Sequence, residues 1–203
     1  MKQHLEDISE IRSLMERSSK FISLSGLSGI FAGTFALIGA YFAYINVASE
    51  LQSADPDISI NSPLVRFLAI DGALVLVFSL IFAIYFTARQ TKKKGLKIWD
   101  KTSKRLLLSM MIPLITGGLF CLILFQNAPQ LIDSATLIFY GLALLNASKY
   151  TFDNVKYLGF AEIVLGLLCG MVNDWNLGLL FWGAGFGVCH IIYGIVMYRE
   201  HKG

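Results

Sequence analysis

Six long apolar runs dominate this 203-residue sequence and restrict the folds that are open to it. An α-helix needs about 20 mainly apolar residues to cross the hydrocarbon core of a bilayer. Apolar residues make up 55% of the chain and charged residues 15%, whereas soluble domains carry about 25% charged residues. The sequence therefore predicts an all-α fold, a polytopic bundle of six transmembrane helices. The runs occupy roughly 21–47, 64–88, 106–126, 130–148, 157–172 and 177–198.

Two of these runs are weaker candidates for membrane spans than the others. The fourth contains Asp133 and Asn146, and the fifth, 157–172, is only about 16 residues long, which is shorter than a typical spanning helix. A four-span protein with a re-entrant hairpin is the alternative, because non-helical backbone can lie at membrane depth when protein shields it.

The basic residues are distributed unevenly over the segments that connect the runs. If the runs cross alternately, sixteen of the seventeen Lys and Arg residues fall on one side, and only Arg66 falls on the other. Cytoplasmic loops carry an excess of Lys and Arg. We therefore expect both termini to be cytoplasmic and the protein to reside in the inner membrane of a cell.

The segment 89–105 is the most basic part of the chain and includes Lys92, Lys93, Lys94 and Lys97. Such a cluster next to a span is typical of a topology signal that contacts anionic lipid headgroups. Because the segment lies between two membrane spans, we expect lipid contact here and no nucleic-acid partner.

Residues 1–20 carry apolar side chains at helical spacing: Leu5, Ile8, Ile11 and Met15. This pattern predicts a short cytoplasmic amphipathic helix ahead of one six-helix domain at 21–203. Such a helix packs in the membrane interface, which is the favoured interpretation; the alternative is that it meets a cytosolic protein partner together with 89–105.

Small residues recur every four positions in the first run, at Ser25, Gly29 and Gly33. Such a ridge lets two helix backbones approach closely in lipid. We interpret it as packing inside the bundle, with a homo-oligomer interface as the alternative.

The fifth and sixth runs carry matching patterns of glycine and one ionisable residue each. In an antiparallel hairpin that turns near 176, the two patterns come into register, and Glu162 lies opposite His190. The glycines that this register pairs are Gly159 with Gly194, Gly166 with Gly187, and Gly170 with Gly183.

An ionised carboxylate inside the membrane is costly unless it is paired. Glu162 lies about 9 Å from Lys156 at the inner boundary, counting 1.5 Å per residue, and a neighbouring imidazole could share its proton or form an ion pair. Asn146 could join this layer from the fourth run, whereas Asp71 enters from the outer side. Two interpretations stay open: a proton- or ligand-linked site, and a polar clamp that fixes helix register.

Other chemistry has little support in the sequence. The three cysteines lie in apolar runs without CxxC spacing, and no HExxH motif occurs. His190 is the one histidine in an apolar run, which disfavours a haem held by two histidines. We therefore expect no metal, no cofactor and no catalytic residues.

Three stretches resemble a group of small, uncharacterised bacterial six-span inner-membrane proteins: MERSSKFISLSGLSG (15–29), IPLITGGLFCLIL (112–124) and LLFWGAGFGVCHIIYGIVMY (179–198). The resemblance implies the six-span plan and no particular activity. The leading hypothesis is a non-enzymatic regulatory or sensory membrane protein with a proton- or ligand-responsive Glu/His site. The alternatives are a small oligomeric transporter or channel subunit that uses the same pair as a proton relay, and a lipid-acting membrane enzyme.

Overall fold

Six long helices make up the computed structural model, which describes residues 25–53, 62–172 and 174–200. No strand occurs in these ranges, and the amphipathic helix expected at 1–20 lies outside them. The helices are α2 (Gly26–Leu51), α3 (Pro63–Lys93), α4 (Lys101–Asn127), α5 (Ile132–Ser148) after the short 3-10 turn η1 (Pro129–Leu131), α6 (Asn154–Val172), and a last helix made of α7 (Trp175–Trp182), the π-helical segment η2 (Gly183–Cys189) and α8 (His190–Glu200).

Each of the six helices is long and apolar enough to cross a membrane. The predicted all-α six-helix bundle is therefore confirmed, and the chain is a multi-pass membrane protein. The fourth run forms a span of 20 residues when η1 is counted with α5. The fifth forms a helix of 19 residues, because α6 begins at Asn154, ahead of the apolar run. This length leaves no support for the four-span alternative.

Polar caps fix where three of the helices begin. Ser62 precedes Pro63 and accepts a hydrogen bond from the Val65 N–H at 3.2 Å. Asp100 forms a reciprocal capping box with Ser103 at the start of α4, and Asp174 accepts from the Leu177 N–H at 2.9 Å at the start of α7. These caps satisfy backbone donors that a helix end leaves unpaired.

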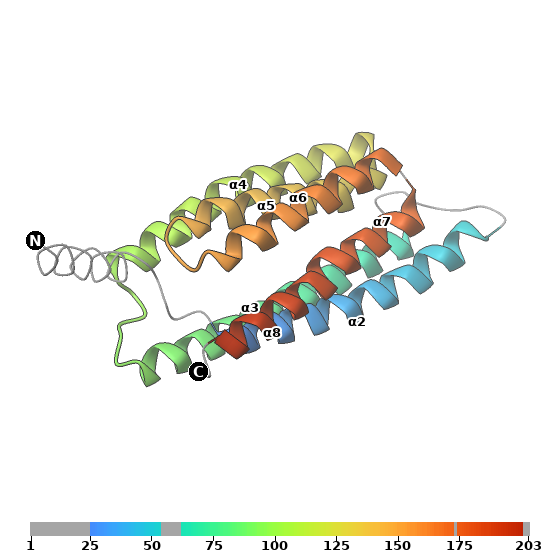
Figure 1. Ribbon diagram of the computed structural model, residues 1–203. Helices are drawn as coiled ribbons and strands as arrows, with labels where there is room; N and C mark the ends of the chain where they lie inside the picture. Colours follow the sequence, from blue (N-terminus) through green and yellow to red (C-terminus); the bar gives the residue numbers. More distant parts are fainter. Residues whose placement is uncertain (1–24, 54–61, 173, 201–203) are drawn as a thin grey trace, which may run out of the picture.

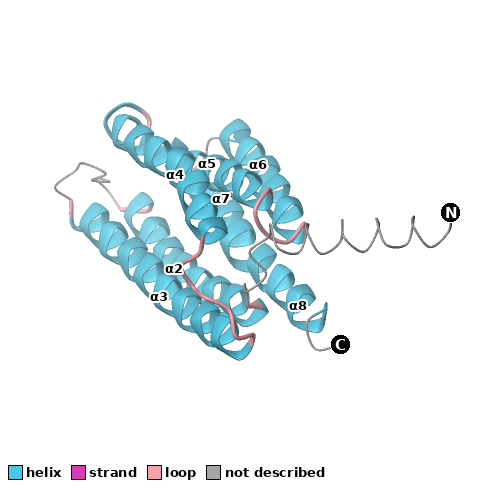
Figure 2. Cartoon of the chain, turned by 90° about the vertical axis from the view of Figure 1, so that its left-hand side faces the viewer, coloured by secondary structure: helices cyan, strands magenta, loops and turns pink. Residues whose placement is uncertain are grey.

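The helices form two groups of three, which lie one above the other in Figure 1 and are seen foreshortened, at an oblique angle, in Figure 2. In one group α5 packs between α4 and α6, and in the other α2 packs between α3 and the last helix. We call these groups the two halves. They meet where α7, η2 and α8 contact α5 and α6, and we call this contact the seam.

Within each half, helix backbones approach closely at glycines. A methyl group built on Gly194 would lie 2.5 Å from the Gly26 carbonyl oxygen of α2, and one on Gly141 would lie 2.6 Å from the Gly159 carbonyl oxygen of α6. Lipid tails are as apolar as leucine, so helices in a bilayer associate through such close packing of small residues.

The predicted register of the two glycine patterns is wrong. The glycines of α6 (Gly159, Gly166 and Gly170) face α5, and those of the last helix (Gly183, Gly187 and Gly194) face α2. The reason is that α5 and α2 carry small residues of their own at the contact, including Ser134, Gly141, Gly29 and Gly33. Each glycine face therefore packs inside its own half.

Helices α3 and α4 turn most of their apolar side chains outward, as in Ile84 (68% exposed) and Ile112 (71%). On its inner side α3 contacts α2 through stacked rings, with Phe31 and Phe82 centroids 5.0 Å apart. The outward faces supply an apolar surface for membrane lipid.

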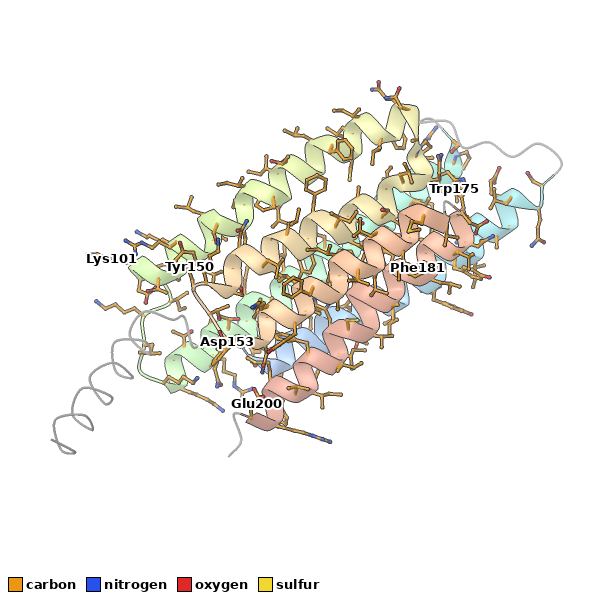
Figure 3. The ribbon with its side chains drawn as sticks, turned by 45° about the horizontal axis from the view of Figure 1, so that its top comes forward. Lys101, Tyr150, Asp153, Trp175, Phe181 and Glu200 are labelled. Carbon is orange, nitrogen blue, oxygen red and sulfur yellow. The ribbon has the colours of Figure 1, made fainter. Side chains whose placement is uncertain are left out.

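Charge separates the two ends of the bundle. Figure 3 shows Lys101, Asp153 and Glu200 at one end, called the Lys101 end, and Trp175 at the other, called the Trp175 end. Over residues 25–53, 62–172 and 174–200, every Lys and Arg except Arg66 belongs to the Lys101 end.

The close contact at Gly194 makes a prediction about stability. Gly194→Ala should destabilise the protein by about 1–3 kcal/mol through overpacking, which lowers the melting temperature by about 2–4 °C per kcal/mol in a chain of this size. Thermal unfolding in detergent measures the change. Gly118→Ala is the matched control, since a methyl group there meets nothing within 4 Å; equal effects would contradict the packing argument.

Candidate functional site

Three polar side chains from three helices meet at the seam. Glu162 is on α6, His190 is the first residue of α8, and Tyr140 is on α5. His190 Nδ1 lies 3.3 Å from Glu162 Oε1, and Tyr140 Oη lies 2.9 Å from His190 Nε2. We call Glu162, His190 and Tyr140 the trio. Its first two members are the pair that the hairpin register placed together.

The contacts of His190 define where its protons lie. Nδ1 is 3.1 Å from the Gly185 carbonyl oxygen, which can only accept a hydrogen bond. Nδ1 therefore carries a hydrogen, and in the neutral ring Nε2 accepts from the Tyr140 hydroxyl. A second proton on the ring would occupy Nε2 and would require the Tyr140 O–H to turn away.

Glu162 is fully buried, with 0% of its side chain exposed. Neither carboxyl oxygen receives a hydrogen bond from the described residues, although the 3.3 Å contact with His190 is within ion-pair distance. The short distance and the missing hydrogen bond are compatible when the Nδ1–H points at the Gly185 carbonyl oxygen. His190 then interacts with Glu162 electrostatically, without donating a hydrogen bond to it. Burying an ionised carboxyl group without a hydrogen-bond donor costs free energy. Binding a proton, or another group that satisfies the oxygens, would remove this cost.

The room for this carboxyl group comes from the last helix. Gly185 has no side chain, and a methyl group built on it would lie 2.5 Å from Glu162 Oε2. Gly185 belongs to η2, a π-helical segment that ends where His190 begins. The backbone N–H of His190 bonds to Gly187, while its ring reaches back to Gly185. π-Helical turns inside α-helices occur often at functional sites.

Aromatic rings close the site on one side. The Phe186 ring centroid is 4.8 Å from that of Trp182 and 5.0 Å from that of Tyr140, and it stacks over the His190 ring at 6.0 Å. These rings form an apolar wall beside the polar groups, and in a medium of low dielectric constant the charge of one group acts strongly on the next.

The other candidate polar residues lie apart from the trio. Asn146 Oδ1 accepts a hydrogen bond from Lys149 Nζ at 3.5 Å near the Lys101 end. The carboxyl group of Asp71 lies against Gly39 of α2, at the contact between α2 and α3. The polar residues expected in the spans thus divide into one cluster at the seam, which holds Glu162 and His190, and two separate positions, Asn146 and Asp71.

The basic cluster lies at the Lys101 end. Lys92 and Lys93 are in the last turn of α3, where cations interact favourably with the helix dipole. Lys94 caps the helix, and partial burial lowers the pKa of its ammonium group. Lys97 is exposed in the link to α4.

Sequence reasoning missed Tyr140 as a member of the site. A signal was present: Asp133, Leu137 and Tyr140 follow one another at spacings of four and three, which places them on one face of α5. Within the described residues, no three His, Cys, Asp or Glu side chains are arranged to hold a metal ion.

Comparisons with known proteins assign no family to this arrangement. No protein-family model matches the chain, and no curated protein or solved structure shows significant similarity to it. The class is therefore defined by fold and site alone: a multi-pass helical membrane protein with a buried Glu–His–Tyr cluster between its two halves.

The bond between Tyr140 and His190 can be tested by removing one hydroxyl group. Tyr140→Phe should destabilise the protein by about 1–3 kcal/mol, because it leaves His190 Nε2 buried without a partner. Tyr157→Phe is the matched control, since Tyr157 is 71% exposed, and it should stay within about 0.5 kcal/mol of the wild type. Unfolding in detergent measures both, and a Tyr140→Phe protein as stable as the control would overturn the assigned bond.

Proposed function

We propose that this protein is a non-enzymatic, proton-responsive regulatory membrane protein, in which the trio binds and releases a proton. The observation that carries the proposal is the Glu162 carboxyl group, which is fully buried beside an imidazole and receives no hydrogen bond within the part of the chain that the structure describes. Histidine changes its charge near neutral pH more readily than any other side chain. The pair therefore has the chemistry to respond to physiological changes in pH.

Proton binding would change the contacts of three helices together. With a neutral ring, Tyr140 donates to His190. With a protonated ring, Nε2 becomes a donor, the Tyr140 hydroxyl must find another acceptor, and the imidazolium faces Glu162 as an ion pair. Because the three groups belong to α5, α6 and α8, this rearrangement acts directly on the seam between the halves.

The seam is suited to pass the change to the membrane surface. Helix α8 continues from His190 to Glu200 at the Lys101 end, where Asn154 of α6 donates to Glu200 Oε2 at 2.6 Å. We propose that this end, with the basic segment 89–105 and residues 1–20, faces the cytoplasm and contacts a cytosolic partner. The excess of Lys and Arg there supports the orientation.

A small proton-coupled transporter is the second candidate, and the order of helices in the halves favours it. One half contains the first, second and sixth spans, and the other contains the fourth, fifth and third. The central helices α2 and α5 cross in opposite directions, so exchanging the first three spans with the last three reproduces the order of helices within each half. Inverted repeats of this kind occur in many transporters, with the binding site between them.

The proposed proton binding predicts a pH-dependent carboxyl signal. Infrared difference spectra of the wild type, recorded in lipid between about pH 5 and 8, should show one buried carboxyl group that gains or loses a proton. Glu162→Gln should remove that band. A melting temperature that changes with pH over the same range, and that becomes flat in Glu162→Gln, would agree with it.

Asp71→Asn is the control for this experiment. It makes the same acid-to-amide change in a membrane span, away from the trio, and should leave the titrating band in place. A wild type with no titrating band over the whole range, and a Glu162→Gln protein that is simply less stable, would refute the proposal and leave Glu162 as a clamp.

The orientation has its own test. A reporter that is active only in the cytoplasm should work when it is fused after Gly203 and should fail when it is inserted after Gln52, in the link between α2 and α3. The opposite result would reverse the proposed topology, because alternate links lie on opposite sides of the membrane.

A further inference from the structure

A second acid faces the seam nearer the Trp175 end. Asp133 is in the first turn of α5, and a methyl group built on Gly178 of α7 would lie 2.9 Å from its Oδ2. Gly178 precedes Gly185 by seven residues, or two turns, so both glycines lie on one face of the last helix, about 10 Å apart in depth. Asp133 and Glu162 thus each face a glycine of the last helix, Gly178 and Gly185, respectively.

Leu137 separates these two acids. Its side chain is 0% exposed, and it follows Asp133 by one turn on α5. A methyl group built on Gly185 would lie 2.5 Å from Leu137 Cδ2, and one on Gly166 would lie 3.0 Å from Leu137 Cβ. Leu137 therefore fills the junction of α5, α6 and η2 between the level of Asp133 and the level of Glu162.

A second apolar layer lies on the other side of the trio. Leu144, Val155 and Leu158 form a buried cluster with Tyr140 and Cys189 packed against it. Leu144 follows Tyr140 by one turn, and Leu158 precedes Glu162 by one turn, so the cluster lies toward the Lys101 end. The Glu162 carboxyl group, which is buried and receives no hydrogen bond from the described residues, is thus enclosed between two apolar layers.

We propose that Asp133 is the entry point of a proton path along the seam, and that Leu137 and the Leu144 layer are the barriers on either side of Glu162. The inference rests on the proposed proton binding at Glu162 and adds the route by which the proton arrives. A proton from water at the Trp175 end binds the Asp133 carboxylate, passes Leu137 through transient water, and is accepted by the trio. It leaves past Leu144 toward the Lys101 end.

The titratable groups around both stations come from several helices. Cys121 of α4 and Cys169 of α6 lie close enough to Asp133 for its charge to act on their thiols. Tyr140, His190 and Cys189 surround Glu162. The thiols and the phenol are weaker acids than a carboxyl group, so the proposed path runs through the two carboxyl groups and the imidazole.

Two barriers in series make a specific prediction about leak. Water enters a buried space only where polar groups hold it, so serine is the substitution that should open each layer. In proteoliposomes with an internal pH dye, the double variant Leu137→Ser/Leu144→Ser should admit protons on the order of tenfold faster than the wild type. Each single variant should stay near the wild type, because the other barrier remains closed.

The leak must also depend on the acids. Adding Glu162→Gln to the double variant should return proton entry to the wild-type rate, and adding Asp133→Asn should lower it. Leu108→Ser/Leu122→Ser is the matched control, since both leucines are exposed on α4, at 66% and 65%, and it should not leak. Retention of a trapped dye checks that the vesicles stay intact.

The outcomes separate this inference from the proposed function. A folded double variant that does not leak, or that leaks equally with Glu162→Gln, overturns the path, whereas the infrared band of the wild type independently decides whether Glu162 titrates. If the serine pair is not monodisperse, Leu137→Ala/Leu144→Ala replaces it. That pair should show a smaller leak with the same dependence on Glu162, and a leak without that dependence overturns the path equally.

Discussion

The absence of a side chain at residue 185 is the constraint on which the site depends. The Glu162 carboxyl group occupies the space that a methyl group would need, 2.5 Å from the built position. The same residue supplies the carbonyl oxygen that orients the His190 ring and lies beside the fully buried Leu137. One glycine thus fixes the place of the acid, the direction of the imidazole and the contact with the apolar layer, which explains why these features occur at one depth.

The two kinds of helix contact in this bundle differ in chemistry. Inside the halves, backbones approach closely at glycines such as Gly194 and Gly141, where a methyl group would overlap the neighbouring helix. At the seam, a carboxyl group, an imidazole and a phenol lie between the helices. Interhelical hydrogen bonds in membranes contribute about 0.6 kcal/mol on average, so exchanging their partners changes little energy. The seam is therefore the contact whose hydrogen bonds the proposed proton binding would rearrange.

The sequence predicted the six helices because a bilayer requires apolar runs of a certain length, and that requirement is local. It placed Glu162 near His190 although the glycine register was wrong, because consecutive antiparallel helices with a short link must meet at equal distances from the turn. The sequence did not reveal that Tyr140 and Asp133 lie at the seam. Their helix, α5, is not a sequence neighbour of the last helix, so the contact depends on how α5, α6 and the last helix pack together. The π-helical turn at Gly185 was also beyond prediction, since it depends on that packing rather than on periodicity.

The chain itself contains an example of what a polar clamp looks like. Ser134 Oγ donates to the Gly166 carbonyl oxygen at 2.7 Å and joins α5 to α6 with every polar atom of the contact satisfied. Such a bond fixes register without placing a charge in the membrane. Glu162 differs in both respects, because its oxygens have no donor among the residues described and its charge must be balanced by His190 or removed by a proton. A group used only to hold helices together would be stabilised by completing its hydrogen bonds, as Ser134 does. A carboxyl group that lacks hydrogen-bond donors and lies beside an imidazole is the arrangement that proton exchange requires.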